Sequence, residues 1–117
     1  MSPKEKCLKV WRRLEETGGA SKRNAYGELG LKPDLNYCAA CESTPYVENG
    51  YKVPKLVCTE CPMYGKWWGP TIKPVNLCGI SGTYYRLWVA VADDDKKAKS
   101  FFAGKVADNV EAEWKDD

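Results

Sequence analysis

Two closely spaced cysteine pairs, Cys38-Ala39-Ala40-Cys41 and Cys58-Thr59-Glu60-Cys61, decide the fold that we expect for this chain. In each pair two residues separate the thiols, so one tight turn can present both sulfurs to the same ion, and two such turns complete a tetrahedron. The spacing therefore predicts a zinc site whose four ligands are Cys38, Cys41, Cys58 and Cys61. Because four protein ligands leave no open coordination position, we expect the zinc to be structural and not catalytic.

Other interpretations of the cysteines stay open. The two pairs could form disulfides, or one pair could act as a redox-active dithiol, which is the main enzymatic alternative. Cys78 could replace one of the four ligands, whereas Cys7 is expected to pack in the core as a small apolar residue. The chain has no histidine, which excludes imidazole ligands and imidazole general bases, so we expect no enzyme.

The composition is that of one small domain. The 117 residues are 44% hydrophobic and 12% aromatic, which is too apolar for a disordered segment. No apolar run approaches the roughly 18 residues of a membrane span, and the N-terminus lacks the roughly 7–15 apolar residues of a signal peptide. We therefore expect a cytoplasmic protein with no membrane partner, and zinc is favoured over disulfides in a reducing cytosol.

The formal net charge is +2, and one Zn²⁺ held by four thiolates would bring it to zero. A neutral protein has little of the long-range field with which a nonspecific nucleic-acid binder displaces counterions from phosphate. The charge therefore weakens a DNA-binding interpretation.

The N-terminal 31 residues show the signals of a helical hairpin. Residues 4–17 place Cys7, Val10, Trp11 and Leu14 on one face, and Ser2 precedes them as a capping residue with Glu5 three positions later. Gly18-Gly19 ends this helix. Ser21 caps a second, shorter helix that Gly30 ends.

The middle of the chain, residues 32–82, is the expected zinc-binding region, rich in proline and glycine. Asn49-Gly50 is a two-residue hairpin signal, with Tyr46-Val47 and Tyr51–Val53 as the two predicted arms. Pro54 would confine the second arm to a sheet edge or end it.

Helical periodicity returns in residues 83–117. Residues 83–92 fit one helix face, although their tyrosines and valines would also suit a buried strand. Asp93–Asp95 could be an acidic metal loop, but the favoured interpretation is the N-cap and first turn of a final helix over residues 96–114. That helix would place one set of apolar residues inward: Phe101, Phe102, Val106, Val110 and Trp114. Together these patterns predict a single α+β domain of a helical hairpin, a zinc-stapled loop region with a short β-hairpin, and C-terminal helices.

The order of the motifs resembles a group of small cysteine-rich proteins encoded in bacteriophage genomes. The motifs are Cys7-Leu8-x-x-Trp11, Cys38-x2-Cys41, Cys58-x2-Cys61-Pro62, Cys78 and Ser81-Gly-Thr-Tyr-Tyr-Arg-Leu-Trp88. The resemblance implies a phage origin, hence the cytoplasm of an infected bacterium, and zinc binding by the four paired cysteines. It implies no activity.

The loop after the second cysteine pair is the candidate partner-binding site. Tyr64, Lys66, Trp67 and Trp68 lie between glycines and prolines, where exposed aromatic side chains would make an interface hot spot or a platform for stacking bases. The alternative is that Trp67 or Trp68 folds back as the core of this region, because tryptophans are highly buried on average.

These observations predict a non-enzymatic phage accessory protein that binds and inhibits a host protein, as part of the conflict with antiviral defence. One alternative is a zinc module that binds nucleic acid in phage transcription or replication. Another is a sponge that encloses a nucleotide signal of host immunity. The sequence names neither the partner nor the oligomeric state.

Overall fold

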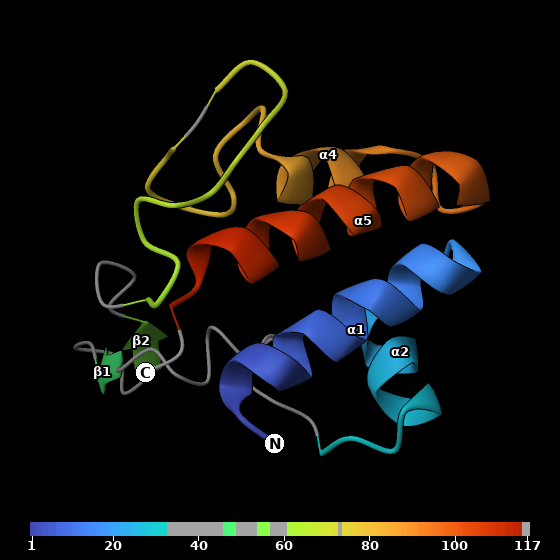
Figure 1. The fold of residues 1–117 in the computed structure, drawn as a ribbon, viewed down its shortest axis with the longest axis horizontal. Helices are drawn as coiled ribbons and strands as arrows, with labels where there is room; N and C mark the ends of the chain where they lie inside the picture. The colour runs from blue at the N-terminus through green and yellow to red at the C-terminus, as the bar shows by residue number, and fades with distance from the viewer. Residues whose placement is uncertain (33–45, 49–53, 57–60, 73, 116–117) are drawn as a thin grey trace.

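Helices near the two ends of the chain form most of the structure that is described (Figure 1). The computed structural model describes residues 1–32, 46–48, 54–56, 61–72 and 74–115. In chain order the elements are α1 (Pro3–Thr17), α2 (Lys22–Glu28), β1 (Tyr46–Glu48), β2 (Pro54–Leu56), α4 (Tyr84–Ala90) and α5 (Lys96–Glu113).

The fold is mainly helical, so the predicted α+β class is wrong. Helices α1 and α5 have 15 and 18 residues, whereas β1 and β2 have three each. The two strands pair antiparallel, from Tyr46 opposite Leu56 to Glu48 opposite Pro54. A ladder this short makes too few backbone hydrogen bonds to form a layer of its own, and the buried core cluster of the described residues comes from the helices and the 61–83 loop.

The hairpin prediction is wrong in the pairing of its first arm, because Tyr46 pairs with Leu56 and Val47 with Lys55. The strand that pairs with them begins at Pro54. Proline is tolerated as the first residue of a strand, because its missing N–H costs no hydrogen bond of the ladder there. The predicted turn Asn49-Gly50 and the predicted arm Tyr51–Val53 lie outside the described residues.

The start and end of α1 follow from its capping residues. The Ser2 hydroxyl accepts a hydrogen bond from the Glu5 backbone N–H at 3.2 Å, and Pro3 occupies the first turn. Gly18 ends the helix with a left-handed φ of 65°, and its N–H donates to the Leu14 carbonyl at 2.9 Å. The predicted helix over residues 4–17 is thereby confirmed.

The other three helices of the described part begin in the same way. Ser21, Thr83 and Asp95 precede α2, α4 and α5, and each side-chain oxygen accepts from the backbone N–H three residues later at 3.1 Å. Such caps satisfy N–H groups that a helix start leaves without a partner, each typically stabilising by about 1 kcal/mol.

Helices α1 and α5 lie side by side and run antiparallel (Figure 1). Near the end of α1, the Ser100 hydroxyl donates to the Glu15 carbonyl at 2.6 Å. At the opposite end, the Lys4 ammonium donates to the Glu111 carbonyl at 3.2 Å. α2 packs on α1 and α4 packs on α5, so this antiparallel pair is the centre of the fold.

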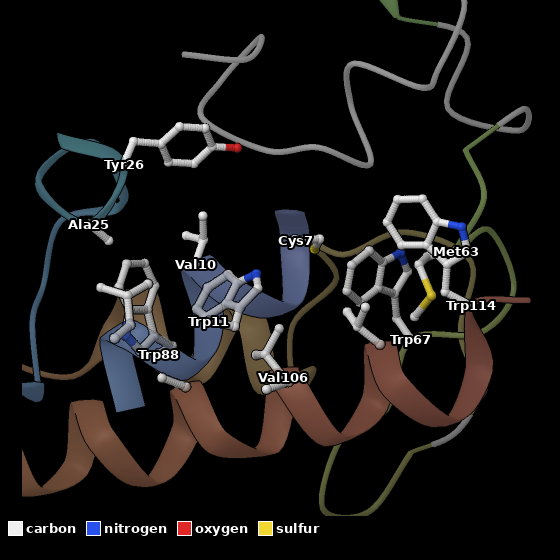
Figure 2. Close-up of a cluster of buried hydrophobic side chains, with 14 residues drawn as sticks. Cys7, Val10, Trp11, Ala25, Tyr26, Met63, Trp67, Trp88, Val106 and Trp114 are labelled. Atoms are coloured by element: carbon white, nitrogen blue, oxygen red, sulfur yellow. The ribbon is translucent and has the colours of Figure 1, made fainter. Parts of the chain in front are cut away.

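Tryptophans fill the core between these helices (Figure 2). Trp11 of α1 meets the Trp88 ring of α4 edge to face, with centroids 5.0 Å apart and planes at 81°. Tyr85 also meets Trp11 edge to face at 5.8 Å and lies 6.4 Å from Trp88, so the three rings form one cluster. Edge-to-face pairs of this kind add roughly 0.5–1.5 kcal/mol to the burial of the rings.

The apolar face predicted for α5 is confirmed at Val106, Val110 and Trp114, which are all buried. It is wrong for Phe101, which is 57% exposed. At 100° per residue, Phe101 lies about 140° around the helix from Val106, on the side away from the core.

Candidate functional site

The 61–83 loop carries the aromatic residues predicted to bind a partner, and Trp67 is a core residue within it. Trp67 is 5% exposed and lies with Met63 and Trp114 near the C-terminal end of α5 (Figure 2). An antiparallel bridge fixes its backbone: the Trp67 N–H donates to the Val75 carbonyl at 3.2 Å, and the Val75 N–H donates back at 2.9 Å. The assignment of Trp67 to a partner-binding surface is therefore corrected.

Tyr64, Lys66 and Trp68 are half-buried, so each keeps part of its surface in solvent. Tight turns position the first two: the Tyr64 N–H donates to the Cys61 carbonyl at 2.9 Å, and the Lys66 N–H donates to the Met63 carbonyl at 3.0 Å. The structure thus separates Trp67 from the other predicted contact residues and leaves those three at the edge of the core.

Asn109 of α5 holds this loop in place, although no sequence pattern singled it out. Its side chain is buried, and Oδ1 accepts from the Trp68 N–H at 2.9 Å while Nδ2 donates to the Lys66 carbonyl at 2.8 Å. One amide therefore satisfies an acceptor and a donor of the loop backbone.

The C-terminal end of the 61–83 loop packs against Trp68 and Gly69 of the same loop. The Tyr84 N–H donates to the Trp68 carbonyl at 2.9 Å, which joins the beginning of α4 to the aromatic segment. Gly69 lies so close to the Gly82 carbonyl that a Cβ at this position would come within 2.0 Å of the oxygen. Only glycine fits this approach, so the loop is a packed part of the fold.

The predicted zinc ligands fall mostly outside the described residues. Cys38, Cys41 and Cys58 lie there, whereas Cys61 and Cys78 are half-buried and pack against the core cluster. Within the described ranges, no group of three or more cysteine, aspartate or glutamate side chains could hold a metal ion. The zinc site stays a prediction. The prediction for Cys7 is confirmed, because it is buried in the core.

A single arginine gathers three carboxylates where α1 faces α5. The Arg12 guanidinium contacts Glu15 at 3.1 Å and both Asp108 and Glu111 at 2.9 Å. Burial opposes the charge on Arg12, but its hydrogen bonds to Asp108, Glu15 and Glu111 outweigh this effect and raise the pKa of the guanidinium above its usual value. Arg12 therefore stays charged at any working pH and orients these carboxylates toward itself.

A second cation, Lys99, is buried at the junction of α4 and α5. Its ammonium donates to the Trp88 carbonyl, lies 4.7 Å from the Trp88 ring centroid and is 3.6 Å from the Asp93 carboxylate. The Trp88 carbonyl is in the last turn of α4, where a positive charge also complements the helix dipole. Lys99 thus joins the end of α4 to the start of α5.

An open cleft of about 410 Å³ lies beside the α1–α5 contact. Its lining mixes charged, aromatic and small residues: Glu15, Lys97, Ser100, Phe101, Gly104, Lys105 and Asp108. Phe101 is the most exposed aromatic side chain among the described residues, and the Lys105 ammonium lies 5.4 Å from its ring centroid. The aromatic group most available for contact is therefore on α5 and not in the 61–83 loop.

Comparison with protein-family models, with curated proteins and with solved structures found no match for this chain. The resemblance to phage proteins therefore stays a prediction. In the described part of the chain, no helix has the length and apolar character needed to cross a bilayer.

Proposed function

We propose that this chain is a non-enzymatic binding protein that acts by covering a surface of another protein through the exposed face of α5. The observation that carries the proposal is the exposure of Phe101, 57%, on the longest helix of the described structure. Aromatic side chains that anchor protein interfaces give large contact area at low entropic cost.

The surroundings of Phe101 support this role because they hold it rigidly. The opposite face of α5 is packed against α1 and α4, and buried Val106, Ala107 and Val110 fix the helix. An anchor on a rigid element loses little conformational freedom on binding, which favours affinity. Tyr64, Lys66 and Trp68 are the second candidate contact surface, with Trp67 as their support from within.

A host protein is the partner class that we propose, because the motif order resembles that of phage proteins. Binding would inhibit the host protein by blocking its own contacts, which requires no catalytic group in this chain. The same proposal places a zinc staple at Cys38, Cys41, Cys58 and Cys61, or with Cys78 in place of one of them.

Affinity capture from a bacterial lysate tests the proposal with matched variants. The wild-type chain, Phe101→Ser and Val89→Ser are immobilised, and retained proteins are quantified by mass spectrometry. Val89 is the control because it is also an exposed apolar residue, 39% exposed, on a neighbouring helix. We expect a host protein that wild type and Val89→Ser retain equally and that Phe101→Ser loses at least about tenfold. Equal retention by all three chains would refute the proposed site.

A further inference from the structure

The face of α5 that carries Phe101 has a lysine one turn before it and another one turn after it. From this arrangement we propose that the stripe Lys97–Phe101–Lys105 binds an extended acidic segment of a partner protein, with an apolar residue of that segment seated on Phe101. This inference rests on the proposed function, because it names the chemistry of the partner for the same surface.

The spacing of the stripe follows from helix geometry. Four residues advance about 6 Å along an α-helix and rotate by about 40°, so the three side chains leave one side of α5 in a row. Lys97 is exposed and Lys105 is half-buried, with its ammonium near the Phe101 ring. A bound segment therefore meets a cation, a ring and a second cation at intervals of about 6 Å.

The charges beside the stripe leave these two lysines available. Within the described part of the chain, neither Lys97 nor Lys105 forms an ion pair with a carboxylate, and the nearby Glu15 and Asp108 both contact Arg12. The carboxylates are thus engaged by a cation of their own on the α1 side. The open charges next to Phe101 are positive, and they complement an acidic ligand.

The spacing of the three side chains along α5 also favours an extended conformation for the bound segment. An extended chain rises about 3.3 Å per residue, so residues two apart cover about 6.6 Å, close to the spacing of the stripe, and point to the same side. An apolar residue with an aspartate or glutamate two positions before and two positions after it matches the stripe.

A second copy of this chain does not fit the same face. If two α5 helices crossed antiparallel at Phe101, Lys97 of one copy would meet Lys105 of the other, and Asp94 would meet Asp108. In a parallel arrangement every residue would face its own copy. Like charges opposite each other are unfavourable in both cases, so two copies do not pair through this face of their α5 helices.

Peptide selection tests the inference even while the partner is unidentified. A displayed library of random 12-residue peptides is selected on the full-length protein after depletion on Phe101→Ser. Enriched peptides are then titrated against wild type, the double variant Lys97→Glu/Lys105→Glu, and the control Lys9→Glu/Lys115→Glu. The control changes the charge equally at two lysines away from the stripe.

We expect enriched peptides with an acidic residue two positions on each side of an apolar one, bound about tenfold more weakly by Lys97→Glu/Lys105→Glu and normally by the control. Copies with lysines at the acidic positions should bind the double variant better than wild type. Phe101-dependent peptides without this acidic pattern would overturn the inference and leave the proposed function standing. If no Phe101-dependent peptide is enriched, or if a 20-nucleotide single strand binds in a Lys97- and Lys105-dependent way, the acidic-segment inference is wrong.

Discussion

At the scale of single residues, the described part of the chain buries three polar or charged side chains: Thr83, which caps α4, and Asn109 and Lys99. Asn109 and Lys99 are each 1% exposed, and each makes contacts that join separate parts of the chain. Asn109 binds the backbone of the 61–83 loop, and Lys99 binds the carbonyl of Trp88. A buried polar group contributes through the partners that would be left unsatisfied if it were removed.

Replacing Asn109 by leucine should lower the free energy of unfolding by about 2–4 kcal/mol, because the Trp68 N–H and the Lys66 carbonyl both lose their partner. Urea denaturation measures the change. Asn24→Leu is the control, since Asn24 is exposed on α2, and a surface change of this kind stays within about 0.5 kcal/mol. Equal stability of the two variants would show that the loop is not held by Asn109.

Replacing Lys99 by methionine should cost about 2–3 kcal/mol, because hydrogen bonds to charged groups are stronger than neutral ones and the last turn of α4 would lose its cation. Methionine keeps most of the side-chain volume, so packing changes little. Lys96→Met serves as the control, because Lys96 is exposed at the start of the same helix. A loss of less than about 0.5 kcal/mol for Lys99→Met would contradict the role assigned to it.

At the scale of elements, the important distinction lies between the two candidate binding surfaces. The 61–83 loop directs Trp67 inward, whereas the outer face of α5 directs Phe101 into solvent. The bridge between Trp67 and Val75 and the clamp from Asn109 give the loop a structural role in addition to any contact it makes.

This distinction predicts opposite effects for two aromatic substitutions. Trp67→Ala should destabilise the protein by about 3–5 kcal/mol, as is usual for a buried tryptophan, while Phe101→Ala should stay within about 0.5 kcal/mol of wild type. Thermal unfolding followed by circular dichroism measures both. If Phe101→Ala proves as destabilising as Trp67→Ala, Phe101 belongs to the core and the proposed surface is wrong.

At the same scale, sequence patterns predicted the ends of the helices better than their buried faces. Ser2, Ser21 and Asp95 act locally, so their capping role could be recognised within four residues of chain. The exposure of Phe101 could not be predicted in this way. Phe101 and the adjacent Phe102 both fit a helical stripe, and only their packing partners decide which of the two side chains is buried. Asn109 could not be predicted for a related reason: its two partners lie more than 40 residues away.

At the scale of the whole molecule, the α+β prediction failed because it relied on the middle of the chain. Asn49-Gly50 indicates a local turn, but a local turn does not determine how many residues pair on either side of it. The core cluster of the described residues instead joins the two ends of the chain through α1 and α5. The four-cysteine zinc site, like the resemblance to phage proteins, stays a prediction.

Zinc binding has a direct test in native mass spectrometry beside the denatured mass. We expect one zinc per chain in the wild type, loss of zinc in Cys38→Ser and Cys58→Ser, and retention in Cys7→Ala, because Cys7 is a core residue. If Cys61→Ser keeps the metal while Cys78→Ser loses it, Cys78 is the fourth ligand. A wild-type mass without zinc would refute the site.

Site-specific photocross-linking tests the central claim, that α5 presents a protein-binding surface, most directly. A photoreactive phenylalanine analogue is placed at position 101, at position 68 or at the control position 9, and each chain is irradiated in a bacterial lysate. We predict that one host protein is cross-linked strongly from position 101, less from position 68 and not from position 9. Equal labelling from positions 101 and 9, or labelling of nucleic acid from position 101, would contradict the claim.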